Sequence, residues 1–175
     1  MADTQRDALT LQGLLGDNVV GAITPQVLRD LLVSAFGGYG WIYVENGGAA
    51  QTVNTAAAKL TAFVNNGAPS NGPIPDNAND YLTVPVAGDY MAEFSASFSG
   101  TASRTFQLQL RKNGLAVPGV RCRTKLNGTG DVTEVSFVGL VTCAANDQLS
   151  VFAAADVDGS SITVVDAALA LKRVG

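Results

Sequence analysis

Hydrophobic and polar side chains alternate with a period of two along residues 89–99. Asp, Glu and Ser fill one set of alternate positions, with Met91 as the single exception. Successive side chains of a β-strand point to opposite faces, whereas a helix would scatter the aromatic residues around its circumference. The pattern predicts one long strand whose core face is formed by Tyr90, Ala92, Phe94, Ala96 and Phe98.

The same alternation continues to the C-terminus in segments separated by turn residues. The expected strands are residues 81–86, 105–112, 120–126, 132–143, 149–155 and 162–174. Asn113-Gly114, between two of them, is the strongest short hairpin signal in the chain. Short strands with a turn about every eight to twelve residues, and no helix between them, predict an all-β fold of the antiparallel jelly-roll sandwich type.

Two of these expected strands, 132–143 and 162–174, carry apolar residues on both faces. A strand of this kind is usually covered by a second sheet on one side and by another subunit on the other. We therefore expect an oligomer whose interface is formed by Phe137, Val138, Leu140, Val165, Leu169 and Leu171.

Residues 39–80 are less regular. Aromatic residues at alternate positions predict a strand over 39–45, and a short strand is expected at 59–65. Residues 51–58 are ambiguous. The Asn, Gly and Pro residues of 65–80 predict a long surface loop inside the same domain.

One helix is expected ahead of the first strand, over residues 23–36. Thr24 is a suitable N-cap, Pro25 stands at the first helical position, and Gly37-Gly38 ends the helix. Its leucine stripe packs either on the chain's own domain or on a partner. We divide the chain into an N-terminal anchoring arm and helix, 1–38, and a β-sandwich, 39–175. The candidate anchor residues are Leu9, Leu11, Leu14, Leu15, Leu28, Leu31 and Leu32.

The composition offers little for catalysis. The chain of 175 residues has no His, which removes the commonest general base and a common zinc ligand. Cys122 and Cys143 lack the local spacing of a metal site and are either buried thiols or a disulfide. We expect no enzymatic activity, no metal and no other cofactor. Neither a secretion signal nor a membrane-spanning segment is evident in the sequence, so we expect a soluble protein with no membrane partner.

Basic residues cluster between positions 104 and 125, although the whole chain has a net charge of −4. The cluster is either a solvated face that protects a sheet edge or a docking patch for an acidic protein surface. Nucleic acid is not expected as a partner, because no exposed aromatic residues alternate with the charges. The candidate docking patch consists of Arg111, Arg121, Arg123 and Lys125.

Two stretches resemble known families. The segment Ile23-Thr-Pro-Gln-Val-Leu-Arg-Asp-Leu31 resembles segments near the N-termini of small structural proteins of tailed bacteriophages. Residues 59–174 resemble the trimeric jelly-roll domain of tumour necrosis factor and of the globular heads of the first complement component, in the version found on phage virions. The resemblance is carried by Gly88-Asp89-Tyr90 before a Phe/Ser-rich strand, the hairpin 110–114, residues 145–149 before a Val/Phe strand, and the long apolar final strand.

These resemblances imply a homotrimer on a virion. The first hypothesis is a phage capsid decoration (cement) protein, made in the bacterial cytoplasm, that binds the major capsid protein on the outer capsid surface and stabilises the shell. The alternative is a fibre tip or adhesin whose loops bind a host protein or glycan. Neither a collagen-like stalk nor a heptad stem is present in the sequence, and both are common in fibrous relatives. This difference favours the decoration protein.

Overall fold

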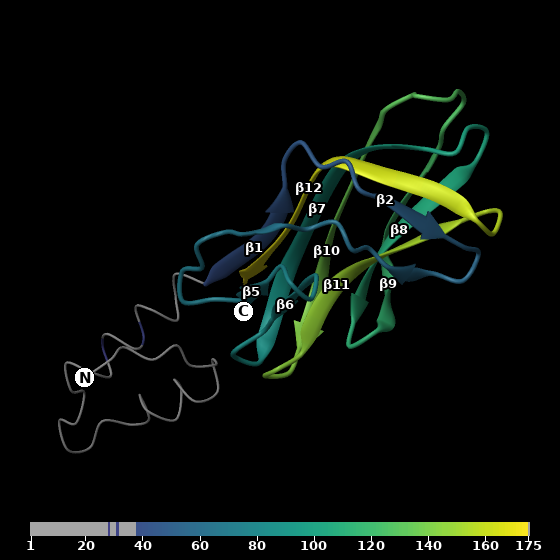
Figure 1. Cartoon of the computed structure of the whole chain (residues 1–175). Helices are drawn as coiled ribbons and strands as arrows, with labels where there is room; N and C mark the ends of the chain where they lie inside the picture. Colours follow the sequence, from purple (N-terminus) through teal and green to yellow (C-terminus); the bar gives the residue numbers. More distant parts are fainter. Residues whose placement is uncertain (1–27, 29–30, 32–37, 175) are drawn as a thin grey trace, which may run out of the picture.

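The computed structural model describes residue 28, residue 31 and residues 38–174. It is an all-β sandwich of two antiparallel sheets with six strands each (Figure 1). One sheet, here called the β7 sheet, has the order β10-β7-β12-β1-β4, and β2 also pairs with β12. The other, the β8 sheet, has the order β5-β6-β11-β8-β9, and β3 also pairs with β11. The jelly-roll class predicted from the strand pattern is confirmed.

The strands vary from two-residue pairs to a C-terminal strand of fourteen residues. Their bounds are β1 Tyr39–Val44, β2 Ala50–Val53, β3 Ala58–Lys59, β4 Asn65–Asn66, β5 Ile74–Asp76, β6 Tyr81–Thr83, β7 Gly88–Gly100, β8 Thr105–Lys112, β9 Leu115–Lys125, β10 Thr133–Cys143, β11 Gln148–Ala155 and β12 Ser160–Arg173.

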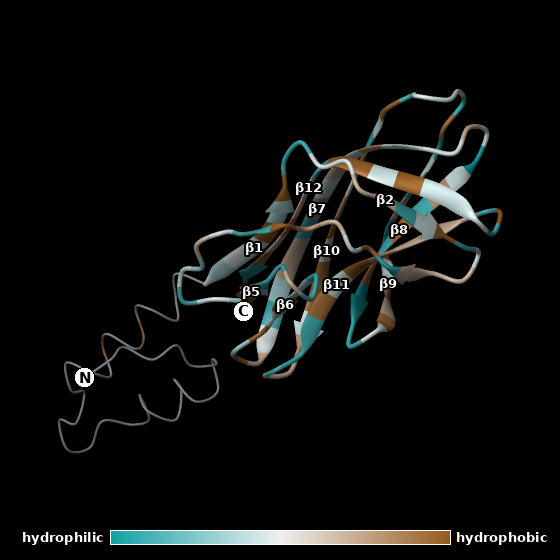
Figure 2. Ribbon diagram, viewed as in Figure 1, coloured by the Kyte–Doolittle hydropathy of each residue, from teal (hydrophilic) through white to brown (hydrophobic). Residues whose placement is uncertain are grey.

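Strand β7 lies between β10 and β12 and has the predicted register. Its five predicted core residues are all buried, and Phe94 stacks on Phe137 of β10 with ring centroids 5.0 Å apart. Phe98 meets Phe106 of the opposite sheet edge-on at 5.6 Å. The same alternation runs along β12, where brown apolar bands alternate with paler bands in Figure 2. The aromatic face of β7 is therefore the centre of the core between the sheets.

The two sheets meet closely at the edge where β9 faces β10. A Cβ atom added to Gly139 of β10 would lie only 2.4 Å from a methyl carbon of Val120 in β9. Only glycine allows the strands to approach so closely at this point. Cys122 on β9 and Cys143 on β10 are free thiols in this structure, so they are not joined to each other.

Several predicted boundaries between residues 51 and 80 differ from the structure. The predicted strand 59–65 is wrong over its middle, because residues 60–64 form no strand and only short pairs flank them at β3 and β4. Instead the carboxylate of Asp80 accepts a hydrogen bond from the Phe63 backbone N–H at 3.1 Å. The predicted surface loop 65–80 contains both β4 and β5, and the ambiguous stretch 51–58 includes most of β2.

The predicted oligomer interface is wrong for three of its six residues. Phe137, Leu169 and Leu171 are buried between the protomer's own sheets, because they share the inward parity of their strands. Val138 and Leu140 are 65% and 68% exposed on the outer face, and Val165 is half-buried beside a β-bulge.

Most of the predicted anchor lies outside the described residues. This applies to Leu9, Leu11, Leu14, Leu15 and Leu32. Leu28 and Leu31 are helical, and Leu28 is 51% exposed. Within the described part of the chain, no helix is long and apolar enough to cross a membrane.

Candidate functional site: a groove on the outer face of the β7 sheet

The outer face of the β7 sheet is built mainly from small side chains flanked by larger ones. Register places Ser95 of β7 between Ser136 of β10 and Ala168 of β12, and Ala168 beside Tyr43 of β1. The adjacent row contains Val138, Glu93, Ala170 and Trp41. Small residues therefore form the middle of the sheet around Ser95 and Ala168, with aromatic residues of β1 on one side and strand β10 on the other.

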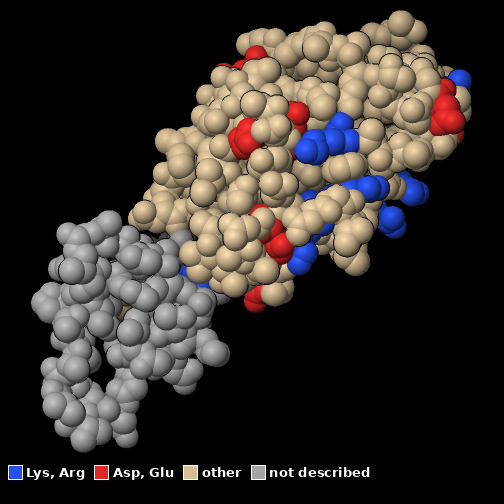
Figure 3. All heavy atoms as spheres, turned by 60° about the horizontal axis from the view of Figure 1, so that its bottom comes forward, with Lys and Arg blue, Asp and Glu red and all other residues tan. Residues whose placement is uncertain are grey.

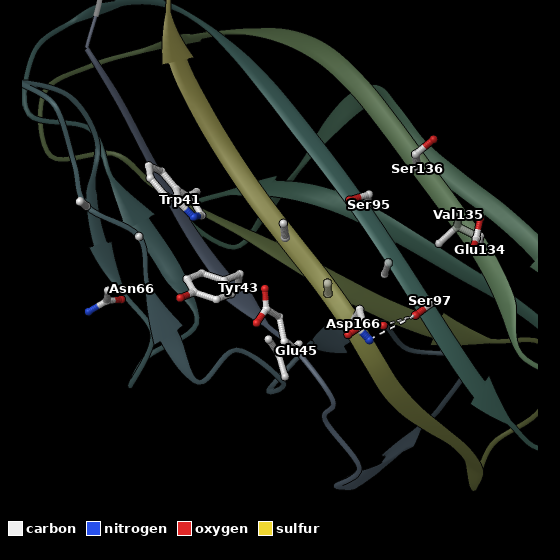
Figure 4. Close-up of a pocket in the computed structure, with 16 residues that line it drawn as sticks. Trp41, Tyr43, Glu45, Asn66, Ser95, Ser97, Glu134, Val135, Ser136 and Asp166 are labelled. Carbon is white, nitrogen blue, oxygen red and sulfur yellow. Dashed lines mark hydrogen bonds between the residues drawn. The ribbon is translucent and has the colours of Figure 1, made fainter.

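An open groove of about 930 Å³ lies on this face (Figure 4). Ser95 and Ser97 contribute to its floor, and Trp41 and Tyr43 line its β1 side. Ala168 also lines the groove. A groove with a flat floor of small residues and an aromatic wall can accept protein side chains without displacing its own. Such a lining is chemically suited to noncovalent contacts.

The aromatic wall is held in place by its neighbours. Trp41 stacks with Tyr39, their centroids being 5.8 Å apart, and the Trp41 carbonyl accepts the Gly67 N–H at 2.8 Å. A Cβ atom on Gly67 would lie 2.0 Å from the indole ring, so a larger residue there would displace Trp41. The backbone near β4 thus fixes one wall of the groove.

One end of the groove is acidic. Glu45, Glu134 and Asp166 line it, and no Lys or Arg among the described residues does. Asp166 is fixed by the backbone N–H of Asn46 at 3.0 Å and by the Ser97 hydroxyl at 3.3 Å, the latter drawn in Figure 4. The carboxylates of Glu45 and Glu134 are exposed and have no hydrogen-bond or ion-pair partner among the described residues.

An aliphatic strip lies on the same face next to the groove. It consists of Val138 and Leu140 of β10 together with Met91 of β7, which pairs directly with Leu140. Leu140 is 68% exposed and Met91 is half-buried. Exposed apolar side chains grouped together on one face are typical of protein–protein contact surfaces.

The groove is lined by hydroxyl, carboxylate, amide, aromatic and small aliphatic side chains. Over the described residues, no three His, Cys, Asp or Glu side chains are grouped so that they could hold a metal ion. Burial raises the pKa of the Cys143 thiol to about 11, and a thiol with so high a pKa is a poor nucleophile. What the geometry supports is recognition.

The predicted basic patch is brought together on the outer face of the β8 sheet. The β8–β9 pairing places Arg121 beside Gln109, Arg123 beside Gln107 and Lys125 beside Thr105. Arg111 lies on the same face, with its guanidinium 4.4 Å from the Phe152 ring centroid. Figure 3 shows blue side chains gathered over the part of the molecule where β8 and β9 lie.

Sequence reasoning missed the groove although one signal for it was present. Tyr39, Trp41 and Tyr43 occupy the positions of β1 that face outward, while Ile42 and Val44 face the core. Three aromatic residues on the non-core face of a strand indicate a contact surface. The floor could not be found in the same way, because Ser95, Ser136 and Ala168 meet only through long-range pairing.

Comparisons with known proteins bear on the fold. No family model and no curated protein sequence matches the chain. Solved structures do match. The Eiger tumour necrosis factor of S. frugiperda has a TM-score of 0.60 at 10% identity over 79% of this chain and 92% of that one. The globular domain of the zebrafish complement 1qA protein has a TM-score of 0.56 at 16% identity over 78% of this chain and 97% of that one. The chain therefore has the jelly-roll fold of tumour necrosis factor and complement domains.

Proposed function

We propose that the protein is a non-enzymatic, trimeric structural protein that assembles through the outer face of its β7 sheet. The observation that carries the proposal is the character of this face: a groove with an aromatic wall lies beside an exposed aliphatic strip on one sheet. Exposing such an apolar face to water is unfavourable, and burying it between copies would stabilise an assembly. The trimeric domains that the sequence resembles support three copies.

The finer proposal is that the trimer decorates a phage capsid, binding the major capsid protein on the outer surface of the virion. It is supported by the likeness of residues 23–31 to segments of phage structural proteins. The exposed, helical Leu28 lies in that segment. By bridging neighbouring capsid subunits, such a protein would add buried area where the shell is under strain.

Light scattering tests the self-association. We expect a mass of three times the 18.0 kDa of one chain. Val138→Asp should reduce it to the monomer, because it places a charge in an apolar contact. Val157→Asp is the matched control: Val157 is also exposed, at 41%, but lies in the turn between β11 and β12. A wild-type monomer at micromolar concentration would refute the proposal.

Co-sedimentation with capsids that lack the protein tests the decoration role. Leu28→Asp combined with Leu32→Asp in the full chain should abolish binding while leaving the trimer intact, since both leucines belong to the predicted anchor stripe. Val157→Asp again serves as a control and should bind normally. Binding of the double variant with near-native affinity would place the anchor elsewhere.

A further inference from the structure

We infer that the basic edge strand β9 of one copy packs into the acidic end of the groove on the next copy. In this contact Arg123 and Lys125 meet Glu45 and Glu134. The inference rests on the proposed self-association, because it specifies which surfaces of two copies meet. The occupant of the groove is thus a second copy of this chain.

The groove presents negative charge, and none of the described residues that line it is a Lys or Arg. Glu45 and Glu134 are exposed, and within the described residues neither carboxylate has a side-chain partner. The third carboxylate of the groove, Asp166, is occupied by Asn46 and Ser97. A contact that buries this end without a cation would carry a large desolvation penalty, so the occupant must bring positive charge.

Strand β9 carries exposed positive charge at the edge of the β8 sheet. It is the last strand of the β8 sheet, and Arg121, Arg123 and Lys125 are exposed at alternate positions along it. Arg121 and Lys125 have no side-chain partner in the described part of the chain. Arg123 uses its Nε to donate to the Gln107 side-chain oxygen at 2.6 Å, and this bond orients the guanidinium.

The cations and the carboxylates lie at the same level, meaning the same position measured along the strand direction. Thr124, beside Lys125, contacts Thr133 through their hydroxyls at 3.1 Å, and Thr133 precedes Glu134. Across the β7 sheet, Glu134 pairs with Ser97 and Ser97 pairs with Asp166, so these three residues lie at that same level. Glu45 directly follows Val44, which pairs with Ala167, so Glu45 ends the same row.

This shared level matters because a rotation about an axis that runs along the strands does not change it. In a ring with that symmetry, the Arg123–Lys125 end of one edge reaches the neighbour at the level of Glu45 and Glu134. An edge that enters a groove is a head-to-tail contact, and such contacts close into rings when the rotation fits. The charge pattern would then set the register of the ring as well as its affinity.

Charge reversal in the full chain tests the inference. R123E/K125E changes the edge, E45K/E134K changes the groove, and a fourfold variant carries both changes. We expect each double variant to raise the concentration at which half of the trimer dissociates by at least about tenfold, since like charges then face each other. The fourfold variant should recover near wild-type association, because opposite charges meet again.

Two further measurements isolate the effect. Asp156→Lys adds a positive charge at an exposed carboxylate outside the groove, and it should leave association unchanged. Thermal unfolding by circular dichroism should show that every variant is folded. The wild-type trimer should also weaken as salt rises from about 0.05 M to about 0.5 M, because screening shortens the reach of exposed charges.

The outcomes separate this inference from the proposed function. A wild-type monomer would refute the self-association itself. A wild-type trimer with double variants that associate equally well would refute only the pairing of β9 with the groove. Loss of association in E45K/E134K without loss in R123E/K125E would also overturn it, because another part of the partner copy would then fill the groove.

Discussion

The aromatic rings on the outer faces of the two sheets differ in whether a cationic side chain covers them. On the β8 sheet, Phe152 lies beneath the Arg111 guanidinium, and the Tyr81 ring lies 5.3 Å from Nζ of Lys59. On the β7 sheet, Trp41 stacks on Tyr39, and no cation covers either ring in the described part of the chain. On the outer face of the β8 sheet, cationic side chains of the same chain cover these aromatic rings. On the outer face of the β7 sheet, the rings and the aliphatic strip remain accessible to another molecule. This contrast supports the proposal that copies assemble through the outer face of the β7 sheet.

The largest effect should come from β7, where one strand contributes to both the core and the outer face. Phe94→Ala should lower the free energy of unfolding by about 3–5 kcal/mol, because it leaves a cavity beside Phe137. The neighbouring change Ser95→Ala, on the outer face, should have an effect within about 0.5 kcal/mol. Urea denaturation under conditions where the protein is monomeric checks both. Equal effects would mean that the two faces are not distinct.

A smaller loss is expected where the sheets touch. Gly139→Ala should lower the free energy of unfolding by about 1–3 kcal/mol, because the new methyl group overlaps Val120 and separates β9 from β10. Gly48→Ala is the control, since a Cβ there meets nothing within 4 Å. Denaturant titration of the pair would contradict the close approach if both variants matched the wild type.

The core was readable from the sequence and the groove was not, for a physical reason. Tyr90 to Phe98 predicted the core face of β7 because strand alternation is a local property. For β10 and β12, local alternation was obscured by apolar residues on both faces. Phe137 and Leu169 were therefore assigned to an interface although they face inward. The groove requires β1, β7, β10 and β12 to lie side by side, and no local pattern encodes that order.

The shortest strands were not predictable from the sequence either. Strands β3, β4 and β5 have two or three residues each, too few to show a period. Their position depends on contacts far along the chain, such as the hydrogen bond from Phe63 to Asp80. The basic patch was easier to predict, because one hairpin with a strong turn signal brings its charges together.

The covering of Phe152 can be tested directly. Arg111→Ala should lower the free energy of unfolding by about 0.5–2 kcal/mol, because it removes both a cation–π contact and the packing of the side-chain stem on the ring. Arg121→Ala, on the same face but without such a contact, should change stability by less than about 0.5 kcal/mol. Chemical denaturation of the monomer measures both. An equal response would mean that the guanidinium does not protect the ring.

The smallest effect on stability should come from the protonation of Asp80, a buried carboxylate in the turn before β6. Asp80 is 7% exposed, and burial raises its pKa above the ordinary value of 3.8, although the Phe63 amide and the Lys59 charge oppose the rise. A raised pKa means that the folded state binds the proton more tightly than the unfolded state. The contribution of Asp80 to stability therefore increases as pH falls through the folded pKa, and it is complete below 3.8.

Asp80→Asn isolates this effect, because the amide keeps the shape and an oxygen acceptor for the Phe63 N–H but cannot titrate. Asn also tolerates the backbone φ of 54° found at this position. We expect the variant to be at least as stable as the wild type at pH 7, and the wild type to gain relative to it as pH falls toward 3.8. Urea unfolding of both proteins across this range measures the difference. A difference that does not change with pH would show that burial of Asp80 does not influence its protonation.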